Sequence, residues 1–257
     1  MSIDWSKRVV FITGASSGIG QALAVELGRR GASLGLLARR AETLDEIAKE
    51  VESAGGRALA LPADVRDAAA VRTAADRLRA QFGRIDVLIA NAGVGATTHA
   101  ADLKADEVAN VININLLGAV NSVTSVVPEM IAQGGGQLVA ISSLAAYRGL
   151  PKSGAYCASK AALSAFFESL RLDLRGTGVD VTIIHPGFIK TPLTAGRQAQ
   201  MPFLMELDDA TRKIVRAIER RKKSYAFPWQ LASIVRLGLL MPVAMYDRIA
   251  ARNSFRE

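Results

Sequence analysis

Residues 13–20 read Thr13-Gly14-Ala15-Ser16-Ser17-Gly18-Ile19-Gly20, between an apolar run that ends at Thr13 and a helical pattern that begins at Gln21. Small residues in such a loop allow a tight turn and let the backbone approach a pyrophosphate, which the helix N-terminus stabilises. The pattern predicts a strand, a phosphate-binding turn and a helix; the alternative is a turn with a structural role alone. The candidate phosphate-binding residues are Gly14, Ser16, Ser17, Gly18, Ile19 and Gly20.

Short apolar runs alternate with longer helical patterns as far as His185. Because each run is followed by a helical pattern, we predict parallel strands with right-handed crossovers and helices on both faces of the sheet. This is the α/β class, a doubly wound and Rossmann-like parallel sheet whose ligands bind outside the carboxyl ends of the strands. The predicted strands are Val9–Thr13, Ser33–Ala38, Ala58–Pro62, Val87–Asn91, Gln137–Ser142 and Asp180–His185.

The composition is that of one packed globular domain. Of the 257 residues, 50% are hydrophobic and 22% are charged, and no repeat or linker marks a second domain. We assign residues 1–195 to the dinucleotide-binding and catalytic core. Residues 196–257 are interpreted as a substrate lid and a basic, apolar C-terminal helical extension of the same domain.

The N-terminus and the cysteine count indicate the compartment. The apolar run at Val9 starts too early for a secretion signal to precede it, so we expect a cytoplasmic protein. The single cysteine, Cys157, excludes an internal disulfide and fits a reducing compartment. One cysteine and two histidines cannot close a zinc site, so we expect no metal and interpret His99 and His185 as structural.

The net charge of +8 is concentrated near the C-terminus. Residues 211–257 hold 11 Lys and Arg against 3 Asp and Glu, whereas residues 1–210 hold 21 of each kind. Seven of the basic residues lie between Arg212 and Lys223. Such a cluster fits either an anionic surface or ligand, or simply a solvated helix face, and we expect no nucleic-acid partner.

The end of the second predicted strand indicates which dinucleotide is bound. Sites selective for NAD place an acidic side chain there for the ribose 2′-hydroxyl, whereas an arginine favours the 2′-phosphate of NADP. The sequence here is Leu37-Ala38-Arg39-Arg40, without an acid. A guanidinium can bind phosphate through two hydrogen bonds, so Arg39, helped by Arg40, predicts NADPH or NADP+ as the cofactor. The alternative is two solvated arginines at the start of a helix.

Tyr156 and Lys160 lie four residues apart at the start of a predicted helix, so their side chains share one face. A tyrosine exchanges protons poorly near neutral pH, because its ordinary pKa is about 10. An adjacent ammonium would stabilise the phenolate and make the phenol a better acid. The spacing alone is not specific, since such pairs are common on helix surfaces.

Together with the glycine loop, these motifs resemble the short-chain dehydrogenase/reductase family from about Lys7 to Leu193. Several motifs of that family occur in the family's order. Two positions depart from it, since Ala90 stands where a second asparagine is common and Ala146 where glycine is frequent. The matching motifs are Thr13–Gly20, Asp64-Val65, Asn91-Ala92-Gly93, Asn115, Ser142-Ser143, Tyr156–Lys160, Pro186-Gly187 and Thr191.

The resemblance implies a role for each matching residue. Tyr156 would be the general acid and base, Ser143 (or its neighbour Ser142) would bind the substrate oxygen, and Lys160 would bind the nicotinamide ribose. Asn115 would support a water that relays protons, which completes a catalytic set of four residues. The implied cofactor contacts are Asp64 and Val65 with the adenine, Asn91, Ala92 and Gly93 along the cofactor, Pro186 and Gly187 beside it, and Ile189 and Thr191 with the carboxamide.

The tail after Thr191 differs in character from the core. Residues 196–207 contain a Met-Pro-Phe-Leu-Met run at 201–205, which fits an apolar lid over the substrate or a buried oligomer contact. Leu237–Tyr246 is far short of the roughly 20 apolar residues that span a bilayer. The tail can instead lie in a membrane interface or dock against the body or a second subunit.

The resemblance thus implies an oxidoreductase that transfers a hydride between NADPH and a carbonyl or alcohol, with a small hydrophobic ketone or aldehyde as substrate. An NAD-dependent alcohol dehydrogenase is the alternative within the family. Two further alternatives are not enzymes: a catalytically inactive dinucleotide-binding protein, and a membrane-surface protein with peripheral contact through the tail. The family's habit of pairing helices implies a homodimer or homotetramer.

Overall fold

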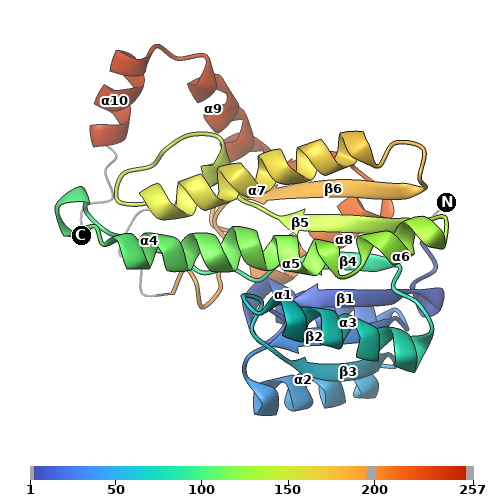
Figure 1. The fold of residues 1–257 in the computed structure, drawn as a ribbon. Helices are drawn as coiled ribbons and strands as arrows, with labels where there is room; N and C mark the ends of the chain where they lie inside the picture. Colours follow the sequence, from blue (N-terminus) through green and yellow to red (C-terminus); the bar gives the residue numbers. More distant parts are fainter. Residues whose placement is uncertain (1–2, 196–200, 253–257) are drawn as a thin grey trace.

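Seven parallel strands form one sheet at the centre of the protein (Figure 1). The computed structural model describes residues 3–195 and 201–252, and in this part the strand order is β3-β2-β1-β4-β5-β6-β7. The predicted doubly wound, Rossmann-like fold is confirmed, as a single domain. The strands are β1 (Val9–Thr13), β2 (Ser33–Ala38), β3 (Arg57–Pro62), β4 (Val87–Ala90), β5 (Gly136–Ile141), β6 (Val179–Pro186) and β7 (Ser224–Phe227).

Strand β7 is absent from the sequence prediction. It pairs in parallel with β6 at the edge of the sheet, where Pro186 lies opposite Phe227. Only Phe227 of its four residues is buried, because an edge strand has a single neighbour. The run Tyr225-Ala226-Phe227 was therefore indistinguishable from the apolar tail that follows it.

Helices cover both faces of the sheet, and β1 shows how the strands divide their side chains. Val10 and Ile12 belong to the core beneath α1, α2 and α8, while Val9 and Phe11 belong to the core beneath α3, α5, α6 and α7. The helices are α1 (Gly18–Arg29), α2 (Ala41–Ser53), α3 (Ala68–Phe82), α4 (Ala105–Ile112), α5 (Gly118–Thr124), α6 (Val127–Ala132), α7 (Gly154–Asp173), α8 (Leu207–Glu219), α9 (Trp229–Leu239) and α10 (Val243–Arg252).

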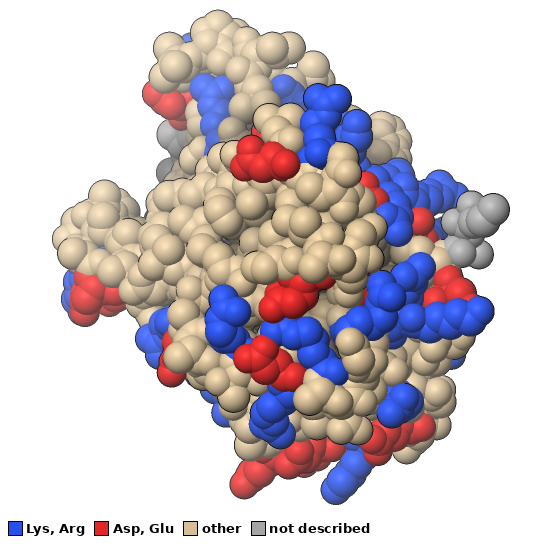
Figure 2. Space-filling view, turned by 45° about the vertical axis from the view of Figure 1, so that its right-hand side comes forward, with Lys and Arg blue, Asp and Glu red and all other residues tan. Residues whose placement is uncertain are grey.

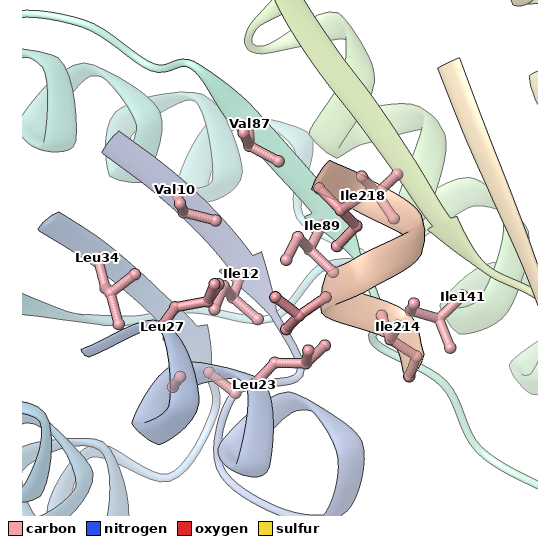
Figure 3. Packing of buried hydrophobic residues seen from close by; sticks show 14 of the residues in the cluster. Val10, Ile12, Leu23, Leu27, Leu34, Val87, Ile89, Ile141, Ile214 and Ile218 are labelled. Carbon is pink, nitrogen blue, oxygen red and sulfur yellow. The ribbon is translucent and has the colours of Figure 1, made fainter. Parts of the chain in front are cut away.

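Helix α8 explains the basic cluster. Its Ile214 and Ile218 pack beside Ile89 and Ile141 of the sheet (Figure 3), while Arg212, Lys213 and Arg216 lie on its exposed side. The solvated-face interpretation fits this arrangement. At the end of α8, Glu219 accepts a hydrogen bond of 3.0 Å from the indole nitrogen of the buried Trp5. Thus α8 and β7, from the segment assigned to the lid and extension, pack into the core of the domain.

Short helical segments connect the larger elements. Three are 3₁₀ helices, and the segment between α4 and α5 is π-helical. The stretch Ala105–Ala132 is long and apolar enough to cross a membrane, but half of its apolar window is buried in the fold, as in a core helix. The short segments are η1 (Trp5–Lys7), η2 (Ala100–Asp102), η3 (Asn113–Leu117, the π-helical one) and η4 (Leu144–Ala146).

Candidate active site

A cavity of about 1440 Å³ opens at the carboxyl ends of the strands, where the fold predicts a ligand. Most residues singled out in the sequence line it. Gly20 and Asn115 are not among the lining residues, and each lies behind the wall. The lining includes Gly14, Ser16, Ser17, Gly18, Ile19, Arg39, Arg40, Asp64, Val65, Asn91, Ala92, Gly93, Ser142, Ser143, Tyr156, Lys160, Pro186, Gly187, Ile189 and Thr191.

The glycine loop has room only for glycine at two of its positions. Gly14 has φ +67°, and a Cβ on it would lie 2.7 Å from the Cα of Ala92. A Cβ on Gly20 would lie 2.3 Å from the carbonyl oxygen of Gly14. The loop therefore packs tightly on the first turn of α1 while its backbone faces the cavity. This geometry fits a pyrophosphate, whose charge the N-terminus of α1 would stabilise.

Asn91 joins the end of β4 to the glycine loop. Its Nδ2 donates to the carbonyl oxygens of Thr13 at 3.0 Å and Gly14 at 3.2 Å. In return, the backbone N–H groups of Asn91 and Ala92 donate to Oγ1 of Thr13 at 3.1 and 3.2 Å. These bonds hold two neighbouring strand ends in one arrangement and set the floor of the cavity.

Positive charge collects where β2 and β3 end. Arg40 donates through Nη2 to the carbonyl oxygen of Ser16 at 2.9 Å and to its Oγ at 3.0 Å, and Arg39 is exposed beside it. Asp64 is paired with Arg66 at 2.7 Å, and hydrogen bonds from Arg66 hold the pKa of that carboxyl below its ordinary value. Sequence reasoning missed Arg66, although its position two residues after Asp64 allowed the pair.

Lys160 is buried beside Tyr156 in the first turns of α7. Its Nζ donates to the carbonyl oxygen of Ile141 at 2.8 Å and lies 5.8 Å from the centre of the Tyr156 ring. The side chain is only 4% exposed, and burial lowers the pKa of Lys160 from 10.5 to about 8. An ammonium at this place acts on the phenol with little screening by water.

Asn115 is fully buried in the π-helical segment η3. Its Oδ1 accepts from the backbone N–H of Val94 at 2.8 Å, and its Nδ2 donates to the carbonyl oxygen of Val94 and to Oγ of Ser159 at 3.0 and 2.9 Å. A Cβ on Gly93 would lie 3.3 Å from Oδ1 of Asn115 and 3.4 Å from Nζ of Lys160. The two polar atoms therefore face the same small space, which Gly93 leaves free of a side chain.

The two serines after β5 differ in their surroundings. Ser142 is buried, and its Oγ donates to the carbonyl oxygen of Lys160 at 3.1 Å and lies 2.8 Å from Oγ of Ser164. Ser143 is half-buried at the cavity wall, and its Oγ accepts from the backbone N–H of Ala145 at 3.1 Å. The hydroxyl of Ser143 can thus still donate a hydrogen bond to a ligand in the cavity.

The remaining wall comes from the C-terminal quarter of the chain. Part of the predicted lid lies outside the described residues, but Met201, Pro202 and Phe203 line the cavity. A β-bridge between Ile189 and Met205 joins the lid to the segment after β6. Helices α9 and α10 complete the wall, and sequence reasoning did not predict their part in the site.

Comparisons with known proteins agree with this fold. Residues 8–202 match the family described as short chain dehydrogenase. An uncharacterized oxidoreductase of Myxococcus xanthus is 43% identical over 97% of this chain and 98% of its own length.

Two solved structures share the fold. A short chain dehydrogenase from Mycobacterium paratuberculosis, described as bound to NAD, is 27% identical, with TM-score 0.79 over 87% of this chain and 97% of its own. A 3-ketoacyl-ACP reductase from Sinorhizobium meliloti is 31% identical, with TM-score 0.77 over 86% and 96%.

The fold and the cavity at its strand ends define a nucleotide-binding enzyme. The matches identify it further: the chain belongs to the short-chain dehydrogenase/reductase family. It is accordingly an oxidoreductase of a family that binds a nicotinamide dinucleotide.

Proposed function

We propose that the protein is an NADPH-dependent carbonyl reductase that acts on a hydrophobic ketone or aldehyde and that runs in reverse on the alcohol. The observation that carries the proposal is the placement of Tyr156 and the buried Lys160 at the cavity wall, opposite the glycine loop. A proton donor and a dinucleotide loop that face one cavity fit hydride transfer better than binding alone.

The four residues named from the resemblance each have a task in reduction. Ser143 donates a hydrogen bond to the substrate oxygen, and Tyr156 gives that oxygen a proton as the negative charge develops there. Lys160 stabilises the resulting phenolate. A water held between Asn115 and Lys160, beside Gly93, returns the proton from solvent.

The cofactor fits the part of the cavity that glycines keep open. Gly14 and Gly20 let the loop pack tightly enough for its backbone to face the pyrophosphate position, Asp64 and Val65 flank the adenine position, and Ile189 and Thr191 stand where the carboxamide would bind. Lys160 would hold the ribose. Bound there, the dinucleotide supplies the hydride.

Arg39 and Arg40 favour NADPH over NADH. Both line the cavity beside Ser16, no acidic side chain occupies the end of β2, and Asp64 is already paired with Arg66. A 2′-phosphate would therefore meet two guanidiniums and one hydroxyl.

The substrate is a ketone or aldehyde with an apolar group. The walls beyond Ser143 and Tyr156 are mainly Leu, Ile, Val, Met, Pro and Phe side chains. The Sinorhizobium meliloti neighbour, described as a 3-ketoacyl-ACP reductase, supports reduction of a ketone on this fold. Apolar walls gain from burying apolar substrate surface.

Replacing Tyr156 with phenylalanine tests the reaction. Tyr156→Phe removes the proton donor, so turnover should fall about 100- to 10,000-fold while NADPH binding stays unchanged. Turnover is measured as NADPH oxidation with a panel of ketones and aldehydes, and binding as the quench of intrinsic fluorescence. Wild-type turnover in the variant would refute the role of Tyr156.

Replacing Arg39 with alanine tests the cofactor. Arg39→Ala should raise the Kd for NADPH about tenfold and leave the Kd for NADH unchanged, because only NADPH carries the phosphate. Titration of both cofactors into both proteins gives the four constants. Equal weakening for NADH and NADPH, or a wild-type preference for NADH, would favour the NAD-dependent alcohol dehydrogenase instead.

A further inference from the structure

The cavity extends past Ser143, Tyr156 and Lys160 into a compartment with aliphatic walls. Leu231, Ile234 and Val235 of α9 lie on one side, and Leu150 and Pro151 of the loop after β5 also line it. Ile234 lines this compartment yet is 57% exposed. Its apolar surface faces a hollow, which an apolar ligand would fill favourably.

The C-terminal helix pair, α9 with α10, has little buried side-chain surface of its own. Ala232 is the one buried residue that α9 contributes, and no described side chain of α10 is buried. In Figure 1 the pair stands apart from the sheet, and α9 packs on the edge strand β7. Its position over the cavity must therefore depend on specific contacts elsewhere.

Those contacts come from Arg148, in the loop that begins with Ser142 and Ser143. Its Nη1 donates to the carbonyl oxygen of Gly238 at the end of α9, and to that of Met241 at 3.3 Å. The guanidinium lies 3.7 Å from the centre of the Tyr246 ring on α10. The hydroxyl of Tyr246 donates in turn to the carbonyl oxygen of Gly149 at 2.5 Å.

These contacts satisfy carbonyls at a helix C-terminus, which ordinarily lack partners, and stack a cation on an aromatic face. One side chain thus joins both helices of the pair to the loop that carries Ser143. Because Nη1 donates to both carbonyls and the guanidinium stacks on the Tyr246 ring, we treat Arg148 as a positioning residue for the helix pair.

We propose that this compartment binds a long aliphatic chain attached to the reacting carbonyl, and that Arg148 sets its depth by holding the helix pair in place. The proposal rests on the proposed function and narrows its substrate class. A short ketone would meet Ser143 and Tyr156 alone, whereas each further methylene would bury surface against α9.

The test is a series of methyl ketones from butanone to tridecanone, titrated by calorimetry into the protein saturated with NADP+, so that no turnover occurs. The Kd of the wild type should fall about threefold to fourfold for each added methylene that is buried. In Arg148→Met the dependence on chain length should flatten. The Kd for tridecanone should rise at least tenfold, while those for butanone and NADP+ stay constant.

Arg248→Met is the matched control, because Arg248 is exposed on α10 and does not line the cavity. It should keep the wild-type dependence on chain length. Tyr246→Phe keeps the ring beneath Arg148 and removes its bond to Gly149, so it should weaken long-chain binding less than Arg148→Met does. Backbone hydrogen exchange of residues 229–250 should be fastest in Arg148→Met, slower in Tyr246→Phe and slowest in Arg248→Met.

A Kd that is independent of chain length in the wild type would overturn the proposal, as would an unchanged dependence in Arg148→Met. Failure of the proposed function would look different. In that case Tyr156→Phe would keep its turnover, or no ketone would be reduced, while the calorimetric dependence on chain length would still be measured.

Discussion

Lys160 lies at the candidate active site, and burying its amine there costs stability. The fold buries its amine among backbone groups, and the carbonyl oxygen of Ile141 is a neutral partner that does not balance a charge. Burial accordingly lowers the pKa of Lys160 to about 8, from 10.5. The apo fold therefore holds this residue at the expense of stability, as is common where a site is organised for a ligand.

Lys160→Met should separate stability from activity. Between about pH 8 and 10.5 the unfolded chain binds more protons than the fold at this position, so the wild-type free energy of unfolding rises with pH there. Below pH 8 the variant should be more stable than the wild type by up to about 3 kcal/mol, because it buries no charge. It should also lose turnover.

Thermal melting of both apo proteins at pH 7 and near pH 10.5 measures the difference. The difference in melting temperature between Lys160→Met and the wild type should be smaller at the higher pH. Lys213→Met, on the exposed side of α8, is the control. A variant that melts below the wild type at pH 7 would show that the hydrogen bond to Ile141 outweighs the buried charge.

Spacing along the sequence indicated candidate site residues, but it did not indicate their hydrogen-bond partners in distant segments. Tyr156 and Lys160 were noticed because they lie one helical turn apart, the resemblance to the family gave them their roles, and the structure places both at the cavity. The partners of Asn115 and Arg148 are fixed by how distant segments meet, such as Val94 with η3 or Gly238 with the loop after β5. Nothing in the local sequence indicates those pairs.

At the scale of elements, α8 shows how one helix serves two environments. Ile214 and Ile218 are fully buried against the sheet, on the face opposite its exposed arginines. Ile218→Ala should lower the free energy of unfolding by about 3 kcal/mol, because it leaves a cavity between α8 and the strands.

Denaturant unfolding checks this value against Lys213→Ala, on the exposed face of the same helix. A surface substitution of that kind should change stability by less than about 0.5 kcal/mol. Comparable effects of the two substitutions would mean that α8 does not pack as described.

The element boundaries that sequence missed have physical causes. Helix α1 begins at Gly18, before the predicted Gln21, because glycines that form a tight turn also enter the first helical turn. Strand β7 exposes Ser224 and leaves Tyr225 half-buried, so it lacks the continuous apolar run of a central strand such as β1. Strand β3, at the other edge of the sheet, keeps the apolar run Ala58–Leu61 and was predicted.

At the scale of the whole molecule, the alternation of apolar runs with helical patterns was enough to predict a site at the carboxyl ends of the strands. The order β3-β2-β1-β4 means that the chain leaves β1 on one side and returns on the other, which opens the crevice next to the glycine loop. The wall made by α9 and α10 could not be predicted, because an apolar tail fits several surfaces equally well.

The apolar side chains of that tail lie in two surroundings: some line the cavity, and others are exposed to solvent. Leu231 and Val235 line the cavity, whereas Leu237 and Leu240 do not line it and are 66% and 84% exposed. Figure 2 shows that the upper lobe, which holds α9 and α10, carries few charges compared with the body below it. Peripheral membrane contact through this outer face stays a prediction.

Vesicle flotation tests the membrane prediction. We expect wild-type protein to float with phosphatidylglycerol vesicles and the double variant Leu237→Glu with Leu240→Glu to remain below. Truncation at Ser224 is unsuitable, because it would remove most of β7 from the sheet. Leu172→Glu, at an exposed site on α7, is the control. The same flotation for all three proteins would contradict a role for α9.

The distribution of the two tryptophans has an optical consequence. Trp5 is 3% exposed and bonded to Glu219, whereas Trp229, at the foot of α9, is 72% exposed. A small quencher such as acrylamide reaches only the second indole, so the quenchable part of the emission belongs to the helix pair. The chain thus carries its own fluorophore at the first residue of α9, the helix whose Leu231, Ile234 and Val235 line the cavity, and ordering of this helix by a bound chain can be followed without a label.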